Sequence, residues 1–183
     1  MWDTTVPMIA LAMRAASLEA LPAFALPERY GWRFYQPGDE REWARIETSA
    51  GEFPCREAGL LRFRQAFAGG ALEERMLFLT DDGIPFATAT AWHESAAEGR
   101  LHWVSVDAAH QGRGLSRVIV HLAMQRLREL GYSSAVLSTQ TASWVAIKVY
   151  RQFGFRPLLR KDGELEGWKI VSEKTGIDFL RYL

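Results

Sequence analysis

The residues at positions 111–116 read QGRGLS and have the composition of an anion-binding turn. Gly112 and Gly114 allow the main chain to turn tightly and to approach a bound group, because no Cβ atom intervenes. An apolar run with helical spacing follows, and the first N–H groups of a helix lack partners within it and favour negative charge. Arg113 or Arg117 can add a positive charge. The sequence therefore predicts a phosphate-binding site at this corner.

Two common phosphate-binding motifs do not fit this corner. The dinucleotide-binding fingerprint needs a third glycine, and Arg117 occupies that position. A P-loop needs Gly-Lys followed by Ser or Thr, which the sequence lacks. Two glycines alone are also typical of an ordinary turn, so the nature of the ligand depends on the neighbouring segments.

Hydrophobic periodicity and turn residues predict the elements that position this corner. Strands are expected at 32–36, 100–106, 133–139 and 155–160, a hairpin at 75–94, and helices at 40–49, 60–68, 115–130 and 143–153. Asp39 is a candidate N-cap for the first helix, and residues 51–59 read as a loop. The run at 8–13 fits a strand or a short helix, and residues 164–176 are compatible with a helix. This order indicates a mixed α/β fold.

The composition is that of a folded globular protein. Its 183 residues, 48% of them apolar, suffice for one domain with a core. The 22 basic residues balance 22 acidic residues, so no global basic field favours nucleic acid. Cys55 is the single cysteine and no metal-ligand spacing surrounds it, so neither an internal disulfide nor a metal is expected. The apolar run at 8–13 is too short to span a bilayer, and we expect a cytoplasmic protein without membrane association.

The chain is predicted to divide into residues 1–29, an N-terminal extension that packs on the domain, and residues 30–183, the domain itself. Pro22 and Pro27 bracket an extended connector between them, since proline disfavours helix in the residue before it. Whether the extension covers its own domain or pairs with a partner subunit stays open. Both a monomer and a homodimer are compatible with the sequence.

Two segments resemble a known family. The segment VSVDAAHQGRGLSRVIVHLA resembles the acyl-CoA-binding segment of the Gcn5-related N-acetyltransferases (GNAT), whose pattern is Gln/Arg-x-x-Gly-x-Gly/Ala. The pattern falls on Gln111, Gly114 and Ser116, and Ser116 is a small residue in place of glycine or alanine. This segment, at a strand-to-helix corner, is weak evidence alone. Together with the second segment, which lies in a predicted helix, it is fairly specific for this family.

The second segment, SWVAIKVYRQFGF, resembles the family signature Asn-x-x-Ala-x-x-x-Tyr followed by Gly-Phe. Ala146, Tyr150, Gly154 and Phe155 match this signature. Ser143 stands where the family commonly has asparagine, which puts one hydrogen bond to the cofactor in doubt. The resemblance is strongest from about residue 100 to residue 156.

The resemblance implies a fold and a cosubstrate. The fold would be GNAT-like: a mixed α/β fold whose mostly antiparallel, twisted central sheet contains a splayed parallel pair of strands and is flanked by helices. The cosubstrate would be acetyl-CoA. Ser105 and Val106 would meet its pantetheine arm, and Ser143 and Ala146 would also lie at the cofactor. The pyrophosphate would be held by Gln111, Gly112, Arg113, Gly114, Leu115 and Ser116.

The implied reaction is the transfer of an acetyl group to a primary amine by direct attack. It needs a base, because a lysine-like ammonium has a pKa of about 10.4, and an acid, because a thiol has a pKa of about 8.5. The resemblance gives Tyr150 the role of the acid. His102 and Glu94 are candidates for the base. A structural role for His102 is equally compatible with the sequence, and a solvated side chain at the end of a strand is the more common outcome for a residue such as Glu94. His102, Val104 and Val106 are predicted to alternate onto one face of their strand.

The resemblance implies that the acetyl acceptor is a small-molecule amine or a peptide. Its pocket would include Phe53, Cys55 and Arg56, with Trp92 and Trp103 on strands. Core packing is the preferred explanation for most of these tryptophans. Two alternatives stay open: a non-catalytic acyl-CoA-binding sensor, and an acyltransferase that acts on a protein N-terminus or a lysine.

Overall fold

The structure is a computed structural model that describes residues 2–183 and divides into two compact units. Unit 1 comprises residues 2–22, 93–100 and 127–183, and unit 2 comprises residues 23–92 and 101–126. Each unit therefore combines segments that lie far apart in the sequence.

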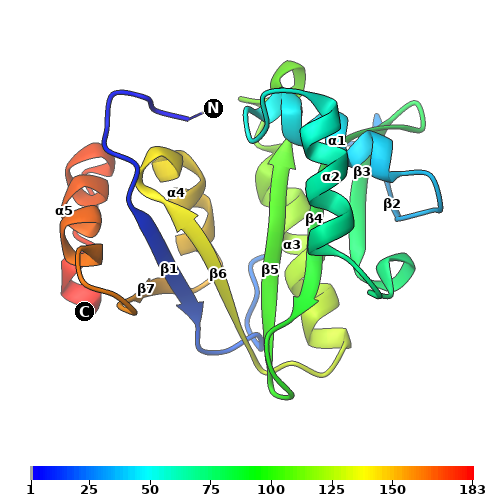
Figure 1. Cartoon of the computed structure of the whole chain (residues 1–183). Helices are drawn as coiled ribbons and strands as arrows, with labels where there is room; N and C mark the ends of the chain where they lie inside the picture. Colours follow the sequence, from blue (N-terminus) through cyan, green and yellow to red (C-terminus); the bar gives the residue numbers. More distant parts are fainter. Residues whose placement is uncertain (1) are drawn as a thin grey trace. The chain divides into compact units, whose positions relative to one another are not determined.

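Unit 2 combines antiparallel strands with helices that pack on them (Figure 1). Its strands are β2 (Tyr30–Phe34), β3 (Met76–Asp81), β4 (Ile84–His93) and the greater part of β5 (Glu98–Val106). Its helices are α1 (Glu40–Ala50), α2 (Arg56–Ala66) and most of α3 (Leu115–Glu129), with short 3-10 helices at Leu72–Glu74 and Ala108–His110. β3 pairs antiparallel with β2 and β4, and the positive φ angles of Asp82 and Gly83 form the turn of the predicted hairpin.

Helix α1 forms where the sequence predicts the first helix, but Asp39 does not cap its N-terminus through the side chain, as the sequence suggests. Asp39 precedes the helix, yet its carboxylate makes no capping hydrogen bond. It accepts hydrogen bonds instead from Arg33 Nη2 at 2.8 Å and from the main-chain N–H of Gln36 at 2.7 Å. Asp39 therefore ties the start of α1 to β2 and the turn that follows it. The helix ends at Gly51, whose φ of 95° suits glycine.

Helix α2 begins earlier than predicted, because residues 56–59 are helical and not part of a loop. Gly59 explains the difference. A Cβ atom at this position would lie 3.1 Å from the Cβ atom of Ala44 on α1, so the glycine allows the two helices to approach closely. A glycine inside a helix costs about 1 kcal/mol relative to alanine. Here close packing between helices outweighs that local cost.

Aromatic side chains fill the core of unit 2. The ring centroid of Trp43 on α1 lies 5.3 Å from that of Phe63 and 5.7 Å from that of Phe67, both in or next to α2. Trp92 and Trp103, from β4 and β5, pack against this cluster. Burying a phenylalanine-sized side chain stabilises a fold by roughly 1.5–3 kcal/mol, so this cluster is a main source of stability for the unit.

Unit 1 is built around a strand near the N-terminus. The run at 8–13 supplies β1 (Ala10–Ala15), which lies between β6 (Ser134–Gln140) and β7 (Phe155–Leu158) and is antiparallel to both. Helices α4 (Trp144–Gln152) and α5 (Glu164–Thr175) accompany these strands (Figure 1). Gly167 allows α5 to pack closely on β1, since a Cβ atom there would lie 2.8 Å from Leu11 Cδ2.

The hydrogen-bonded order of the seven strands is β2-β3-β4-β5-β6-β1-β7. β5 and β6 run parallel, with residues 98–100 opposite residues 134–136. The predicted mixed α/β fold, with a mostly antiparallel sheet and one parallel pair, is confirmed. In the part of the chain that the structure describes, residues 2–183, no helix combines the length and the apolar character needed to cross a membrane.

Candidate functional site

The glycine corner in unit 2 has the geometry that its sequence predicts. Gly112 and Gly114 both have a φ of 77°, a left-handed conformation that favours glycine, and α3 begins at Leu115. Leu115 is buried and anchors the first turn of the helix, whereas Gly112 and Arg113 are exposed. The main chain thus reverses just before the helix N-terminus and leaves the corner accessible.

Side chains of the corner itself hold it in place through hydrogen bonds to the rest of unit 2. Gln111 Nε2 donates a hydrogen bond to the carbonyl oxygen of Val106 at 2.9 Å, which joins the corner to the end of β5. Arg113 donates from Nη1 to the hydroxyl of Tyr30 at 3.2 Å and from Nη2 to the carbonyl oxygen of Ala109 at 3.1 Å. Two of the predicted cofactor-binding residues, Gln111 and Arg113, therefore also shape the loop itself.

Asp107, at the end of β5, is a structural residue that the sequence reasoning missed. Its carboxylate accepts hydrogen bonds from the main-chain N–H of Ala109 at 3.0 Å and from Arg45 Nη1 at 2.6 Å. Burial acts to raise the pKa of Asp107, but these hydrogen bonds outweigh it and lower the pKa overall. The only sequence signal is its position directly after a predicted strand.

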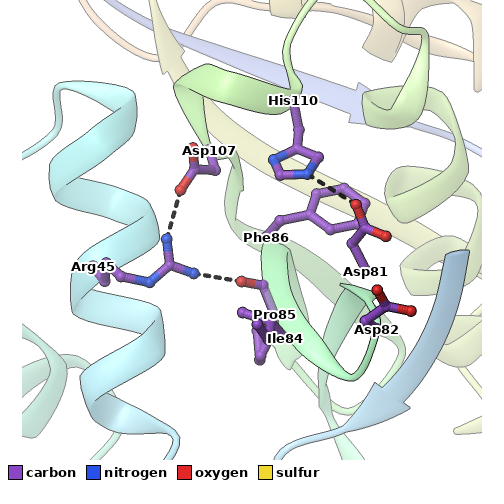
Figure 2. Close-up of a pocket in the computed structure, with 8 residues that line it drawn as sticks. All are labelled: Arg45, Asp81, Asp82, Ile84, Pro85, Phe86, Asp107 and His110. Carbon is purple, nitrogen blue, oxygen red and sulfur yellow. Dashed lines mark hydrogen bonds and ion pairs between the residues drawn. The ribbon is translucent and has the colours of Figure 1, made fainter.

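Figure 2 shows a pocket of about 260 Å³ beside this turn. Its lining residues are Arg45, Asp81, Asp82, Ile84, Pro85, Phe86, Asp107 and His110. The imidazole of His110 stacks on the ring of Phe86 with centroids 4.2 Å apart, and its Nε2 atom lies 3.7 Å from Asp81 Oδ2. Arg45 also donates to the carbonyl oxygen of Pro85. Because these lining groups pair with one another, their contacts hold the residues before the glycine corner in place. None of the predicted site residues lines the pocket.

Strand β5 departs from the alternation that the sequence predicts. Trp103 has a φ of 47°, which is a strained conformation for a bulky residue. As a result, consecutive residues contact the α1–α2 layer: the ring of His102 lies 5.9 Å from that of Phe67, and the ring of Trp103 lies 5.2 Å from that of Trp43. The prediction that His102, Val104 and Val106 alternate regularly along β5 is therefore wrong at Trp103.

Glu47 is a second residue that the sequence reasoning missed. Its side chain is fully buried, and Oε2 accepts a hydrogen bond from Ser105 Oγ at 2.6 Å. Burial raises the pKa of Glu47 to about 8, although the hydrogen bond from Ser105 acts to lower it. A signal was available: Glu47 follows Trp43 by four residues and Ile46 by one, so it is a carboxyl group on the apolar face of α1.

The remaining predicted site residues lie in unit 1. Tyr150 is buried in α4, and its ring lies 6.1 Å from that of Phe155. Ser143 precedes α4, and its hydroxyl accepts a hydrogen bond from Gln140 Nε2 at 3.0 Å. Ala146 follows on the same helix. Glu94, just after β4, forms an ion pair with Arg100 at 2.6 Å.

The structure thus brings one group of the predicted site residues together in unit 2 and a second group in unit 1. The unit 2 group consists of His102, Ser105, Val106 and residues 111–116, and the unit 1 group consists of Glu94, Ser143, Ala146 and Tyr150. Among residues 2–183, no cluster of three or more His, Cys, Asp or Glu side chains is arranged to bind a metal ion.

The fold and the glycine corner define a class of protein. Residues 30–155 match the sequence profile of the acetyltransferase (GNAT) family, and the chain belongs to this family. The family resemblance found in the two sequence segments is therefore confirmed.

The matches to individual relatives cover only part of the length of those proteins. Mycothiol acetyltransferase from Nocardia farcinica is 27% identical over 154 residues, which are 79% of this chain and 51% of that protein. N-acetyltransferase 8B from Homo sapiens is 35% identical over 57 residues, 31% of this chain and 25% of that protein. A GCN5-related N-acetyltransferase from Sphaerobacter thermophilus shares the fold with a TM-score of 0.66 and 23% identity, over 81% of this chain and 48% of the other. The chain spans about half the length of the mycothiol acetyltransferases it matches.

Proposed function

We propose that this chain is an acetyl-CoA-dependent N-acetyltransferase that transfers an acetyl group to the primary amine of a small molecule. The glycine corner before α3 supports this proposal most strongly, because it lies inside the region that matches the GNAT profile. A Cβ atom added to Gly112 would meet no atom within 4 Å, so the space beside the main chain is open to a ligand. The residues present therefore fit the phosphate groups of acetyl-CoA.

The corner and the end of β5 would hold the cosubstrate. Main-chain N–H groups of residues 111–116 would bind the pyrophosphate, and Arg113, already held by Tyr30, would add its charge. Ser105 and Val106 would bind the pantetheine arm through their main chain. Acetyl-CoA supplies the acetyl group as an activated thioester. A main-chain N–H near Val106 would stabilise the negative charge that develops on the carbonyl oxygen.

Proton transfer completes the proposed reaction. Tyr150 would donate a proton to the departing thiolate, the role that the family resemblance gives it. Among the bases predicted from sequence, the carboxylate of Glu94 is engaged by Arg100 at 2.6 Å, and the ring of His102 packs on Phe67. Both of these candidate bases therefore already have contacts within the structure.

The relatives support a small amine as the acceptor. The name mycothiol acetyltransferase gives mycothiol as the compound associated with those proteins. A mycothiol-type amine therefore belongs in a substrate screen beside simple amines, polyamines, amino acids, aminoglycosides and peptides. The peptides also cover the alternative of a protein N-terminus or a lysine side chain.

The decisive experiment is an acetyl-CoA turnover screen over this panel, coupled to calorimetric titration with CoA. We expect CoA binding together with acetylation of at least one small amine. Tight CoA binding with no turnover on any amine would instead support an acyl-CoA sensor. One observation favours that second candidate: Ser143 replaces the common asparagine, and its hydroxyl is engaged with Gln140.

A further inference from the structure

The contact between α1 and β5 contains a carboxyl group whose bonding is incomplete. Glu47 is 0% exposed, and its Oε2 atom accepts the hydrogen bond from Ser105 Oγ at 2.6 Å. Its other oxygen, Oε1, is buried, and no group among the described residues 2–183 donates a hydrogen bond to it. A buried polar atom without a partner is unfavourable unless a function retains it. The Oε1 atom of this carboxyl can therefore take up a proton or bind a further polar group.

The same layer contains further buried polar atoms that have no hydrogen-bond partner in the part of the chain that the structure describes. They are Trp43 Nε1 and Thr48 Oγ1 on α1 and Trp103 Nε1 on β5. The strained backbone of Trp103 brings its ring to 5.2 Å from that of Trp43. Strain and unsatisfied polar atoms together are typical of functional sites, where they are retained against their energetic cost.

We propose that Glu47 and Ser105 form a proton relay that accepts the proton of the attacking amine during acetyl transfer. This inference rests on the proposed function. Ser105 is the member of the pair that would contact the amine, and Glu47 acts through it as a positioning residue. The choice of Ser105 follows from its place on β5, directly before Val106, whose N–H is proposed to meet the carbonyl oxygen.

The proton and bond changes balance without any further reactant. As the amine nitrogen forms its bond to the acetyl carbon, its proton passes to Ser105 Oγ, and the hydroxyl proton of Ser105 passes to Glu47 Oε2. The carbon–sulfur bond breaks, and the thiolate takes a proton from the general acid, proposed to be Tyr150. Glu47 then returns its proton by way of Ser105, and Tyr150 regains a proton from solvent, before the next turnover.

Burial and a like charge act on Glu47 in the same direction. Burial raises the pKa of its carboxyl, and Glu52, in the loop after α1, adds to this because it has the same sign. The ionisable side chains of the neighbouring elements contact other residues: His102 on β5 packs its ring on Phe67, and Arg62 on α2 lies 5.7 Å from the ring centroid of Trp103. Because burial raises the pKa of Glu47 to about 8, the carboxyl can both gain and release a proton near neutral pH.

The test compares Glu47→Gln and Ser105→Ala with Glu73→Gln, a matched control at an exposed glutamate of the same unit. We expect each relay variant to lower kcat/KM by a factor on the order of 10² and to lose the ionisation near pH 8 from its acid limb. The double variant should lose little more than either single variant, because both residues act as one unit. The control should keep the wild-type profile, and CoA affinity should not change in any variant.

A second readout does not depend on turnover. The infrared carboxyl band of the wild-type protein should titrate near pH 8, and Glu47→Gln should lack this transition. An unchanged acid limb in Glu47→Gln, with an active wild-type enzyme, would overturn the relay alone. Absence of turnover in the wild type would overturn the proposed function and the relay together, so the two failures are distinguishable.

Discussion

Arg45 on α1 donates a hydrogen bond from Nη1 to Asp107 Oδ2 at 2.6 Å and so fixes the turn that leads into the glycine corner. Both side chains are largely buried, with 24% and 13% of their surfaces exposed. The same guanidinium contacts Glu42 at 2.9 Å. It also donates to the carbonyl oxygen of Pro85 (Figure 2). One arginine therefore connects a helix, the β3–β4 hairpin and the end of β5.

Replacing Arg45 by alanine should destabilise the protein by about 1–3 kcal/mol, because the largely buried carboxylate of Asp107 loses a charged partner. We also expect weaker CoA binding, since residues 107–110 lead directly into the corner. Denaturant unfolding and calorimetry would measure the two effects. Arg41→Ala, at an exposed position of the same helix, is the control. Equal stability of the two variants would show that the Arg45–Asp107 pair contributes nothing.

Gly114→Val should abolish CoA binding while the fold survives. A branched side chain is strained at a φ of 77° and would stand where phosphate is proposed to approach the main chain. Gly163→Val is a suitable control, because Gly163 has a φ of 89° and precedes α5 in unit 1. Both variants should lose some stability from strain, but only Gly114→Val should lose CoA affinity in calorimetric titration. Unchanged affinity would mean that the phosphates bind elsewhere.

The sequence predicted most of the fold because its turn residues and periodicity agree with the final structure. The corner at 111–116, the hairpin turn at 82–83 and the helix end near Gly131 all follow from local rules, and each glycine there has a positive φ. The N-terminal run could not be assigned, because a strand as short as β1 obtains its hydrogen bonds from β6 and β7, which are distant in sequence. The start of α2 was missed for a similar reason, since only its packing on α1 explains Gly59.

The side-chain arrangement of the candidate site was harder to predict than its backbone. Motif spacing predicts residues 111–116 as a candidate site, and the structure has the predicted glycine conformations there. Regular strand alternation gave a wrong pattern for β5, because the strained backbone of Trp103 is visible only in three dimensions. Glu47 was overlooked because no motif contains it. A glutamate on the apolar face of a helix is a general warning of a buried carboxyl group, and this rule would have identified it.

His102→Phe separates two assignments of the proton acceptor. If Glu47 and Ser105 relay the proton, this variant should keep the ionisation on the acid limb and lose less than about tenfold in kcat/KM, because the aromatic packing on Phe67 is retained. The pH dependence of kcat/KM is the measurement. Loss of the acid limb in His102→Phe, together with its retention in Glu47→Gln, would give the role back to His102.

Glu47 should also make stability depend on pH. Its pKa is raised from 4.5 to about 8, so between these values the folded protein holds a proton that the unfolded chain has released. The free energy of unfolding should therefore fall as pH rises through this window, by about 1.4 kcal/mol per pH unit for one group. Glu47→Gln should remove this contribution. Denaturant unfolding from about pH 5 to about pH 9 would test it, and parallel curves for variant and wild type would contradict it.

Tyr150→Phe distinguishes an enzyme from a sensor. The substitution keeps the ring, which is buried and lies 6.1 Å from the ring of Phe155, and removes only the hydroxyl. If the hydroxyl protonates the departing thiolate, kcat should fall by a factor on the order of 10² to 10⁴. Stability should change by only about 0.5–1.5 kcal/mol, the usual contribution of one hydrogen bond, and CoA affinity should be preserved.

The matched control for Tyr150→Phe is Tyr132→Phe, at a position in unit 1 outside the proposed site. Steady-state kinetics and a melting curve on both variants provide the comparison. A purely structural Tyr150 predicts the reverse pattern, with a modest loss of stability and full turnover. Because Tyr150→Phe keeps the ring packing and removes only the hydroxyl, that result would remove Tyr150 as the general acid. The thiolate would then leave unaided or take its proton from water.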